Sequence, residues 1–358
     1  MKTTLAIVLF CTLYAGSVTV ARAVCVGASV NSFGAKGDGH TDDTAAIQSA
    51  IKAASSAGGG SVVFGVARYF TTGTFTVPQG VVLCGVIEGP FDVAGVNPAV
   101  TTVAPTLLIT STSGPFLTLQ NGAGVTDLLF HYPNQVSTSA SAPMVYPYTI
   151  VMNAPATKVT RSTVTNAYNF LDIEVGASMA QDLFIGAFNI GVYIDHAPNH
   201  LNLRNLFNQV FWDVLENVQY PRPIDTWVLN HGIALVVGRM DSLEIHDFFV
   251  FSRFTGILLT DSTDTTQGIT CGYGTASDID LDTVQYGIVI TASNIPGYKF
   301  TNVDIGAAPG LGKAAVQVRT GGSMLPKIEI NGGSQRGTWA SGAYPAAAPD
   351  TIIVNILP

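Results

Sequence analysis

The sequence predicts an all-β solenoid in which short strands stack coil upon coil, with one α-helix near the N-terminus. Short apolar runs alternate with polar residues along most of the 358-residue chain, which is the pattern of strands that bury one face. Gly, Asn, Asp or Ser follows each run, and the chain holds 37 glycines, so turns separate the strands at short intervals.

A two-strand unit repeats in the central region. Its second strand opens with Gly and a β-branched residue, at Gly191, Gly232, Gly256 and Gly287. The unit is about 20 residues long and takes its insertions at one place, which indicates a solenoid rather than a β-sandwich. The first strands of the unit are residues 183–185, 201–204, 243–246 and 279–282.

One segment has the pattern of a helix, which we expect near residues 43 to 57. Asp42 or Asp43 can cap its start, and the glycines at 58–60 end it. Its apolar residues recur at helical spacing and therefore form one buried face. They are Ala46, Ile47, Ala50, Ile51 and Ala54.

Residues 1–23 are predicted to be a signal peptide. Lys2 gives a positive start, residues 5–13 are an apolar run, and residues 21–23 fit a small-x-small cleavage site before Val24. We therefore expect a secreted protein, extracellular or periplasmic, in which residues 24–358 form one domain and 24–60 its N-terminal cap.

The cysteines that remain after this cleavage are Cys25, Cys84 and Cys271. Export would allow one disulfide, for which Cys25 with Cys84 is the preferred pair. The simpler interpretation is that Cys84 and Cys271 are small buried hydrophobic residues.

Charge and hydropathy argue against two classes of partner. The formal net charge of −8 disfavours nucleic acid, and an acidic glycan would need a local basic patch. No stretch after residue 23 is long and apolar enough to span a bilayer, so no membrane partner is expected once the signal peptide is removed.

Residues 31–51 read Asn-Ser-Phe-Gly-Ala-Lys-Gly-Asp-Gly-His-Thr-Asp-Asp-Thr-Ala-Ala-Ile-Gln-Ser-Ala-Ile. This segment resembles the N-terminal signature of the pectate-lyase-superfamily proteins, a group that includes polygalacturonase-like enzymes and phage tailspike depolymerases. The resemblance implies a right-handed parallel β-helix over residues 24–358, with an N-terminal α-helix that caps the open end of the core. It also implies a polysaccharide partner and, by similarity to the tailspikes, a homotrimer. Asp38, Asp42 and Asp43 are expected to serve the turn and the helix cap.

The catalytic pattern of polygalacturonases is not reproduced. That pattern requires an Asn-Thr-Asp, an adjacent Asp pair, a Gly-His-Gly and an Arg-Ile-Lys. The adjacent pair here is Asp42-Asp43 in the cap, and residues 230–232, Asn-His-Gly, match the histidine motif only weakly. Ordinary pectin hydrolysis is therefore not predicted, because the fold alone fixes no reaction.

Alternation along the strands predicts a polar patch on the outside of one sheet. If the apolar residues of the repeated first strand point inward, their neighbours stack outward in two columns, about 4.8 Å apart from coil to coil. The first column is Asn202, Glu244 and Asp280, and the second is Arg204, His246 and Asp282.

Carboxylates in this patch predict a polysaccharide-degrading enzyme, in first place a glycoside hydrolase. Glu244 stacked directly on Asp280 would give a spacing of about 5 Å, which suits a retaining enzyme. The diagonal pair Glu244 and Asp282, at about 7–8 Å, would suit an inverting enzyme with room for a water.

Other functions remain open at the same patch. In a polysaccharide lyase, Arg204 would neutralise a uronate carboxylate while His246 removes the adjacent proton. Asp278, Asp280 and Asp282 could bind calcium, a cofactor that we expect only for a lyase; otherwise no metal or cofactor is expected. The alternative of a different class is a non-catalytic glycan-binding or adhesion protein, whose outer polar residues are simply solvated.

The longest insertion, at about 207–231, supports a sugar groove. It contains Trp212, Tyr220, Asp225 and Trp227, and aromatic rings bind the apolar faces of sugars. We expect it to border the face that carries Glu244 and His246 and to contribute substrate contacts together with Asn202 and Arg239. Weaker candidates are the acids and the imidazole at strand ends, Asp195, His196 and Asp241.

Overall fold

The structure is a computed structural model that describes residues 25–93, 96–135, 141–209, 223–264, 271–319, 327–342, 344 and 352–357. The predicted signal peptide, residues 1–23, lies outside the described residues. The helical elements are η1 (Val30–Phe33), α1 (Thr44–Ser56) and α2 (Pro223–His231). The strands are β1 (Gly27–Ser29), β2 (Asp38–Asp42), β3 (Gly60–Phe64), β4 (Arg68–Thr71), β5 (Phe75–Val77), β6 (Val81–Gly85), β7 (Thr106–Ile109), β8 (Leu117–Leu119), β9 (Gly124–Thr126), β10 (Leu129–His131), β11 (Tyr148–Met152), β12 (Lys158–Ile173), β13 (Ser178–Ile194), β14 (Leu201–Gln209), β15 (Ile233–Val237), β16 (Met240–Leu259), β17 (Gly272–Ile290), β18 (Gly297–Ala307), β19 (Ala314–Val318), β20 (Ile328–Arg336) and β21 (Ile352–Leu357).

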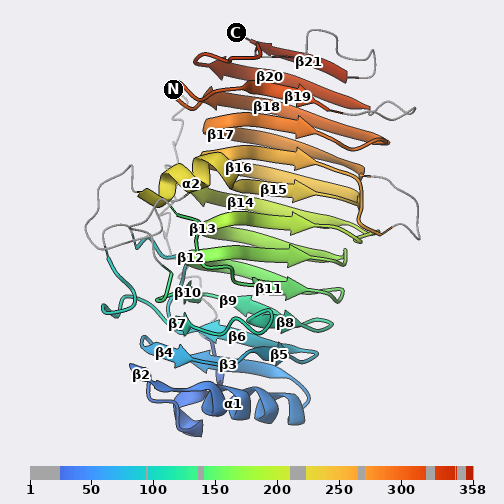
Figure 1. Cartoon of the computed structure of the whole chain (residues 1–358). Coiled ribbons are helices and arrows are strands. Elements are labelled where there is room, and N and C mark those ends of the chain that lie inside the picture. Colours follow the sequence, from blue (N-terminus) through green and yellow to red (C-terminus); the bar gives the residue numbers. More distant parts are fainter. Residues whose placement is uncertain are drawn as a thin grey trace, which may run out of the picture.

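The chain is mostly β, and the pairings between its described strands are parallel. Each turn of the chain therefore lies on the one before, and the strands rise in order from β2 near one end of the stack to β21 at the other (Figure 1). No helix among the described residues is long and apolar enough to cross a membrane.

Three ladders of paired strands run along the stack. Ladder A joins β1, β3, β6 and β9 to the first parts of the long strands β12 to β14 and β16 to β18, and then to β20 and β21. Ladder B joins β2, β4, β7 and β10 to the middle of the same long strands. Ladder C joins β5, β8, β11, β15 and β19 to the ends of β12, β13, β16 and β17.

The predicted alternation across the strands is confirmed. Leu201, Leu203, Leu243 and Ile245 are all at most 2% exposed, and they belong to one apolar cluster that extends from Val30 to Ile356. Polar residues between them face outward, so a continuous core fills the inside of the coils.

The N-terminal helix forms close to where it is predicted. Its buried residues are Ile47, Ala50, Ile51 and Ala54, and α1 lies at the end of the stack beside β3 (Figure 1). The Asp42 carboxylate accepts the Thr44 backbone N–H at 3.0 Å, which satisfies one of the free donors of the first turn. Asp43 instead accepts the N–H groups of Lys36 and Gly37 at 2.6 and 3.0 Å, so the acids of this motif are accounted for by the turn and the helix start.

A second helix departs from the sequence prediction of one helix. α2 begins at Pro223, a residue that suits the first helical turn because it needs no N–H donor there. Ile224 and Val228 pack against Phe188 in a small separate cluster. The rest of the predicted insertion, residues 210–222, lies outside the described residues.

Cys25 and Cys84 form a disulfide with 6.2 Å between their Cα atoms, as preferred from the sequence. Cys271 is a free, fully buried thiol and fills the core as a small hydrophobic residue.

From β9 to β18, the corner between ladders A and B is made by one residue per coil in the left-handed conformation. Asn and Asp tolerate this conformation better than other residues with a side chain. Three pairs of corner residues also bond between coils. The Asn205 amide donates to Asp182 and the Asn302 amide donates to Asp278, both at 2.7 Å, and the Arg161 guanidinium donates to Asp127 at 2.8 Å. The corner residues are Asp127, Arg161, Asp182, Asn205, Asp247, Asp278 and Asn302, with φ between 43° and 59°.

The Gly that recurs at the start of ladder C is required for a different reason than backbone conformation. A Cβ on Gly191 would overlap the side-chain amide of Asn208, and one on Gly287 would overlap the Ala315 carbonyl of the next coil. These glycines are therefore required by close approach of neighbouring coils.

Replacing Asn205 tests the corner. Asn205→Ala should lower the free energy of unfolding by about 1–2 kcal/mol, since it loses both the tolerance for φ > 0 and the bond to Asp182. Asn205→Gly keeps the backbone freedom and should cost less than Asn205→Ala. Urea unfolding of both variants measures the difference, and a glycine variant less stable than the alanine variant would contradict the corner model.

Candidate functional site

The polar patch predicted on ladder A is partly confirmed. Asn202 pairs with Glu244 in neighbouring coils, and the Asn202 amide donates to the Glu244 carboxylate at 3.2 Å. Arg204 pairs with His246 in the same register. Two coils of both predicted columns therefore lie as expected.

The predicted stacking of Glu244 on Asp280 is wrong. Glu244 pairs with Thr275, whereas Asp280 pairs with Phe249 in ladder B. Both carboxylates face outward, 43% and 45% exposed, but the Asp278 corner separates their faces. Asp282 likewise pairs with Phe251 rather than His246, so neither carboxylate pair proposed from the sequence forms on ladder A.

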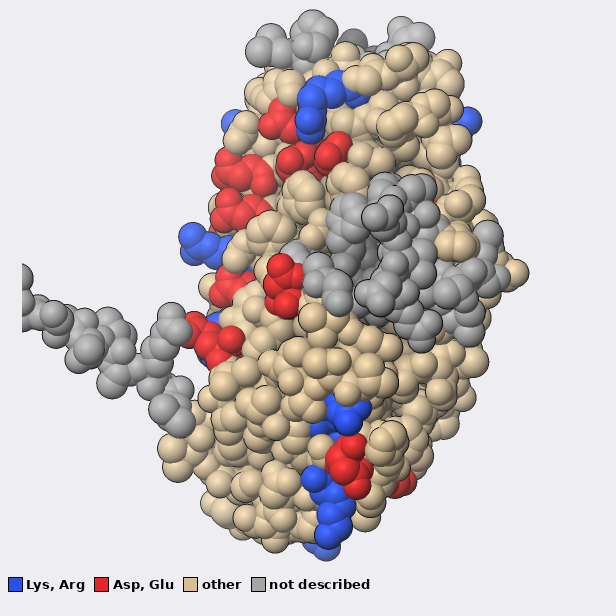
Figure 2. All heavy atoms as spheres, turned by 90° about the vertical axis from the view of Figure 1, so that its left-hand side faces the viewer, with Lys and Arg blue, Asp and Glu red and all other residues tan. Residues whose placement is uncertain are grey.

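Asp280 and Asp282 have a different neighbour. The Arg336 guanidinium lies 3.7 Å from Asp280 and 4.0 Å from Asp282. Burial raises the pKa of Asp280, and the Arg336 charge opposes that rise. Figure 2 looks at the side of the stack where β2, β4 and β7 lie, and it shows acidic side chains in a row along one edge.

The predicted calcium ligands do not converge. Asp278 accepts the Asn302 amide at 2.7 Å on the corner, while Asp280 and Asp282 share Arg336. Within the described part of the chain, these three carboxylates do not form a group of ligand atoms close enough for one cation.

The described part of the insertion does not border the Glu244 face. Trp227 stacks on His231 with 4.5 Å between ring centroids and lies near Tyr168, at the corner between ladders B and C. Asp225 is fully buried, which argues against direct contact with a sugar. Trp212 and Tyr220 lie outside the described residues. Arg239 pairs with Asp241 at 3.5 Å.

A cluster that was not predicted as a centre lies on the outer face of ladder C. Asp172 pairs with Tyr193 of the next coil, and the rings of Tyr148 and Tyr193 approach to 6.2 Å across the coil that carries Asp172. Asp172 is only 9% exposed, and its Oδ1 atom is buried without a hydrogen bond from the described residues. Such an acid resists ionisation, because the charged form loses its hydration.

Burial, reinforced by the charges of Glu174 and Asp195, raises the pKa of Asp172 to about 7. Burial also raises the pKa of Tyr193 to about 12 and moves the pKa of Tyr148 well above its usual value. Both phenols are therefore neutral hydrogen-bond donors at neutral pH. Asp172 is poised to hold or release a proton there, which is the property of a general acid or base.

Asp195, close to this cluster, has the opposite behaviour. Burial alone would raise its pKa, but hydrogen bonds from Ser262, Thr263 and the Arg239 backbone outweigh burial and lower the pKa to about 2. The carboxylate also accepts the Tyr193 hydroxyl at 3.2 Å and the His196 backbone N–H at 2.9 Å. Its oxygens are fully occupied, so Asp195 acts as an ionised anchor that joins ladder C to residues 262–263.

Sequence reasoning identified Asp195, His196 and Arg239 as strand-end candidates but missed Asp172. The local signal was weak, because one Asp between Leu171 and Ile173 looks like any outward residue of a strand. Its raised pKa comes from burial by neighbouring coils, and contacts with residues distant in the sequence cannot be predicted from the pattern around Asp172.

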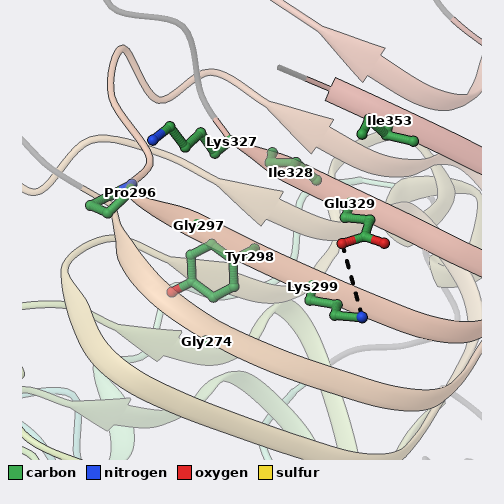
Figure 3. A pocket seen from close by; sticks show the side chains of 9 residues that line it. All are labelled: Gly274, Pro296, Gly297, Tyr298, Lys299, Lys327, Ile328, Glu329 and Ile353. Carbon is green, nitrogen blue, oxygen red and sulfur yellow. Dashed lines mark ion pairs between the residues drawn. The ribbon is translucent and has the colours of Figure 1, made fainter. Parts of the chain in front are cut away.

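Two grooves lie on the outer face of ladder A. One, of about 480 Å³, contains the predicted residues Asn202 and Arg204 together with Lys158 and His200. The other, of about 550 Å³, lies between β17, β18, β20 and β21. Figure 3 shows its Lys299 facing Glu329, and their charged groups are 3.9 Å apart.

Comparison with known proteins agrees with this architecture. A family model described as "Rhamnogalacturonase A/epimerase, pectate lyase-like" matches residues 27–102. A tailspike protein from a bacteriophage of Escherichia coli O157:H7 superposes with a TM-score of 0.53 at 12% identity, over 88% of this chain and 38% of its own. An exopolygalacturonase from Thermotoga maritima gives a TM-score of 0.51 at 10% identity, over 87% and 81%. The chain fits the pectate-lyase-like superfamily of parallel β-helix proteins.

Curated relatives match a short segment of this chain. Alginate lyase 7 of Azotobacter vinelandii is 58% identical over 45 residues, 13% of this chain and 5% of the relative. A mannuronan C5-epimerase of the same organism is 56% identical over 45 residues, which is 2% of its length. The chain therefore corresponds to a small fraction of these relatives.

The Asp172 environment predicts a pH-dependent stability. The folded chain holds this proton up to about pH 7, whereas the ordinary value is 3.8, so the folded state binds more protons between these values and the free energy of unfolding falls as pH rises. The total fall in the free energy of unfolding is at most about 4 kcal/mol, and Asp172→Asn should remove it. Urea unfolding from pH 4 to 8 measures it, with Asp247→Asn on an exposed corner as the matched control. Equal pH profiles for wild type and Asp172→Asn would show that Asp172 ionises normally.

Proposed function

We propose that the chain is a polysaccharide-acting enzyme, a glycoside hydrolase whose general acid is Asp172 on ladder C. The observation that carries the proposal is the buried Asp172 carboxyl, with its pKa raised to about 7 beside Glu174 and Asp195. A hydrolase needs one carboxyl group that stays protonated near neutral pH to give a proton to the leaving oxygen.

Glu174 is the candidate for the second carboxylate. It follows Asp172 by two residues and is half-buried, and after burial its negative charge contributes most to the raised pKa of Asp172. Two residues of extended chain place their Cα atoms about 6.6 Å apart, a backbone spacing comparable with the carboxyl separation of an inverting enzyme. In that role Glu174 would activate a water while Asp172 protonates the glycosidic oxygen.

The two tyrosines and Asp195 have supporting roles in the proposal. The neutral phenol of Tyr148 can donate a hydrogen bond to a sugar oxygen, whereas the Tyr193 hydroxyl already donates to Asp195 and can only accept one from the sugar; both rings offer apolar surface. Asp195 is a positioning residue, because it accepts the Tyr193 hydroxyl and holds Thr263 beside the strand end. The proposed catalytic carboxylates therefore lie on ladder C, and not on ladder A as predicted from the sequence.

Hydrolysis is favoured over elimination by the charge of this face. A lyase needs a cation that neutralises the uronate carboxylate. The outward column of ladder C that holds Asp172 has no Lys or Arg among its described members, which are Thr76, Thr118, Val151, Asp172, Tyr193, Val236, Leu258, Val289 and Gln317. Arg319 donates to Gln317 at the far end of the column, five coils beyond Asp172. Acidic sugars would be repelled there, so we infer that the cleaved linkage joins neutral sugars.

Several observations support the broader parts of the proposal. The structural neighbours include an exopolygalacturonase, and a relative that matches over 45 residues is named an alginate lyase, so polysaccharide is the proposed substrate class. The Cys25–Cys84 disulfide supports export to an oxidising compartment, as expected of a secreted protein. The right-handed winding, the capping role of α1 and a homotrimer remain predictions.

Substitution of each carboxylate tests the site. Asp172→Asn and Glu174→Gln should keep glycan binding but lower turnover by about 10²–10⁴-fold, the usual contribution of general acid–base catalysis. A panel of neutral and acidic glycans supplies substrates, with new reducing ends measured for hydrolysis and ultraviolet absorbance of unsaturated products measured for elimination. Asp247→Asn is the matched control and should retain full turnover.

Glu244→Gln separates the two faces of the molecule. If Glu244→Gln lost turnover and Asp172→Asn retained it, the active site would lie on ladder A and the proposal for Asp172 would be wrong. Unsaturated products would mean a lyase, and glycan binding without any product would favour the adhesion function.

A further inference from the structure

The groove of about 480 Å³ on ladder A is distinct from the proposed catalytic cluster. Six of its residues come from three successive strands, β12, β13 and β14, and the turn before the last. They are Lys158, Met179, Gln181, His200, Asn202 and Arg204. Ladder A and ladder C are different faces of the coil, so a ligand here would not contact Asp172.

The groove is basic on an acidic protein. The chain carries 16 Lys and Arg against 24 Asp and Glu, yet Lys158 and Arg204 both line this groove. Both side chains are exposed, and neither has an ion-pair partner among the described residues. The second groove differs, because its Lys299 already faces Glu329 at 3.9 Å.

The spacing of the two cations is fixed by the register. Lys158 pairs with Met179, and Met179 pairs with Asn202, so Lys158 and the Asn202–Arg204 strand are two coil steps apart, about 10 Å at ~4.8 Å per step. The half-buried Met179 side chain lies between them. An extended ligand could therefore meet a cation, an apolar surface and a second cation in succession.

We propose that this groove is a non-catalytic binding site for a glycan that carries carboxylate groups on successive sugars. Arg204 offers a planar fork that pairs with a carboxylate through two hydrogen bonds. Lys158 meets a second carboxylate as a point charge, and Met179 contacts the sugar ring between them. Gln181, which pairs with Arg204 in the neighbouring coil, adds a donor and an acceptor for hydroxyl groups.

One end of the groove is closed to anions. Glu244 lies in the coil after Asn202, accepts the Asn202 amide at 3.2 Å and lies 3.8 Å from His200. Its negative charge would repel a carboxylate placed further along ladder A. The ligand should therefore extend from Asn202 towards Lys158, over the earlier coils.

Calorimetry with an oligogalacturonate trimer tests the proposal on the full chain. Wild type should bind it, Arg204→Gln should bind about tenfold more weakly, and Lys158→Gln should also weaken binding. Lys327→Gln removes the same charge from the second groove of ladder A and should have no effect. Higher salt should weaken binding, and Asp172→Asn should bind like wild type.

The site would be overturned by no binding of the trimer by wild type, by wild-type binding in both Arg204→Gln and Lys158→Gln, by an equal loss in Lys327→Gln, or by equal binding of a neutral maltotriose. Competition by inorganic phosphate at equal concentration would also overturn it, since it would reveal a general anion site. The proposed hydrolase activity is tested in a separate assay, which measures new reducing ends released from a neutral glycan.

Discussion

The whole molecule depends on the parallel register that places each coil on the one before. Strands of one coil cannot satisfy their hydrogen bonds or cover their apolar edge alone, so each coil is completed by its neighbours. From β9 to β18, the corner between ladders A and B keeps this register, because one left-handed residue per coil turns the chain at the same place. Asn205 and Asn302 strengthen it, since their amides bond to the corner aspartates of the preceding coil.

The register also decides which side chains can act together. Outward residues of one ladder stack into columns, whereas residues beyond a corner face another direction, however similar their sequence context. Glu244 and Asp280 are separated in this way, and Asp172 and Tyr193 are brought together. Loops between ladders complete the faces: Ser262 and Thr263 lie beyond ladder C and attach to it through Asp195.

Local pattern was enough to predict a mostly β chain, the inward residues of the first strand, the N-terminal helix and the Asn202–Glu244 and Arg204–His246 pairs. These features depend on alternation within a strand or on turn chemistry beside it. The error at Asp280 arose because Ile279 and Leu281 repeat the apolar spacing of Leu243 and Ile245 but belong to ladder B. Both ladders have the same period of two, so pattern alone cannot assign a strand to its face when coil lengths vary.

Asp172 and Asp195 show why burial must be weighed against hydrogen bonding before a role is assigned. Asp195 accepts several hydrogen bonds that stabilise its charge, and its role as a structural anchor is sufficient to explain why an Asp is present there. Asp172 has a buried oxygen that accepts no hydrogen bond from the described residues, which costs free energy of folding. Its column neighbours Val151 and Val236 show that an apolar residue fits this face, so packing does not require an acid. This combination of a folding cost and a raised pKa supports the proposed role of Asp172 in proton transfer.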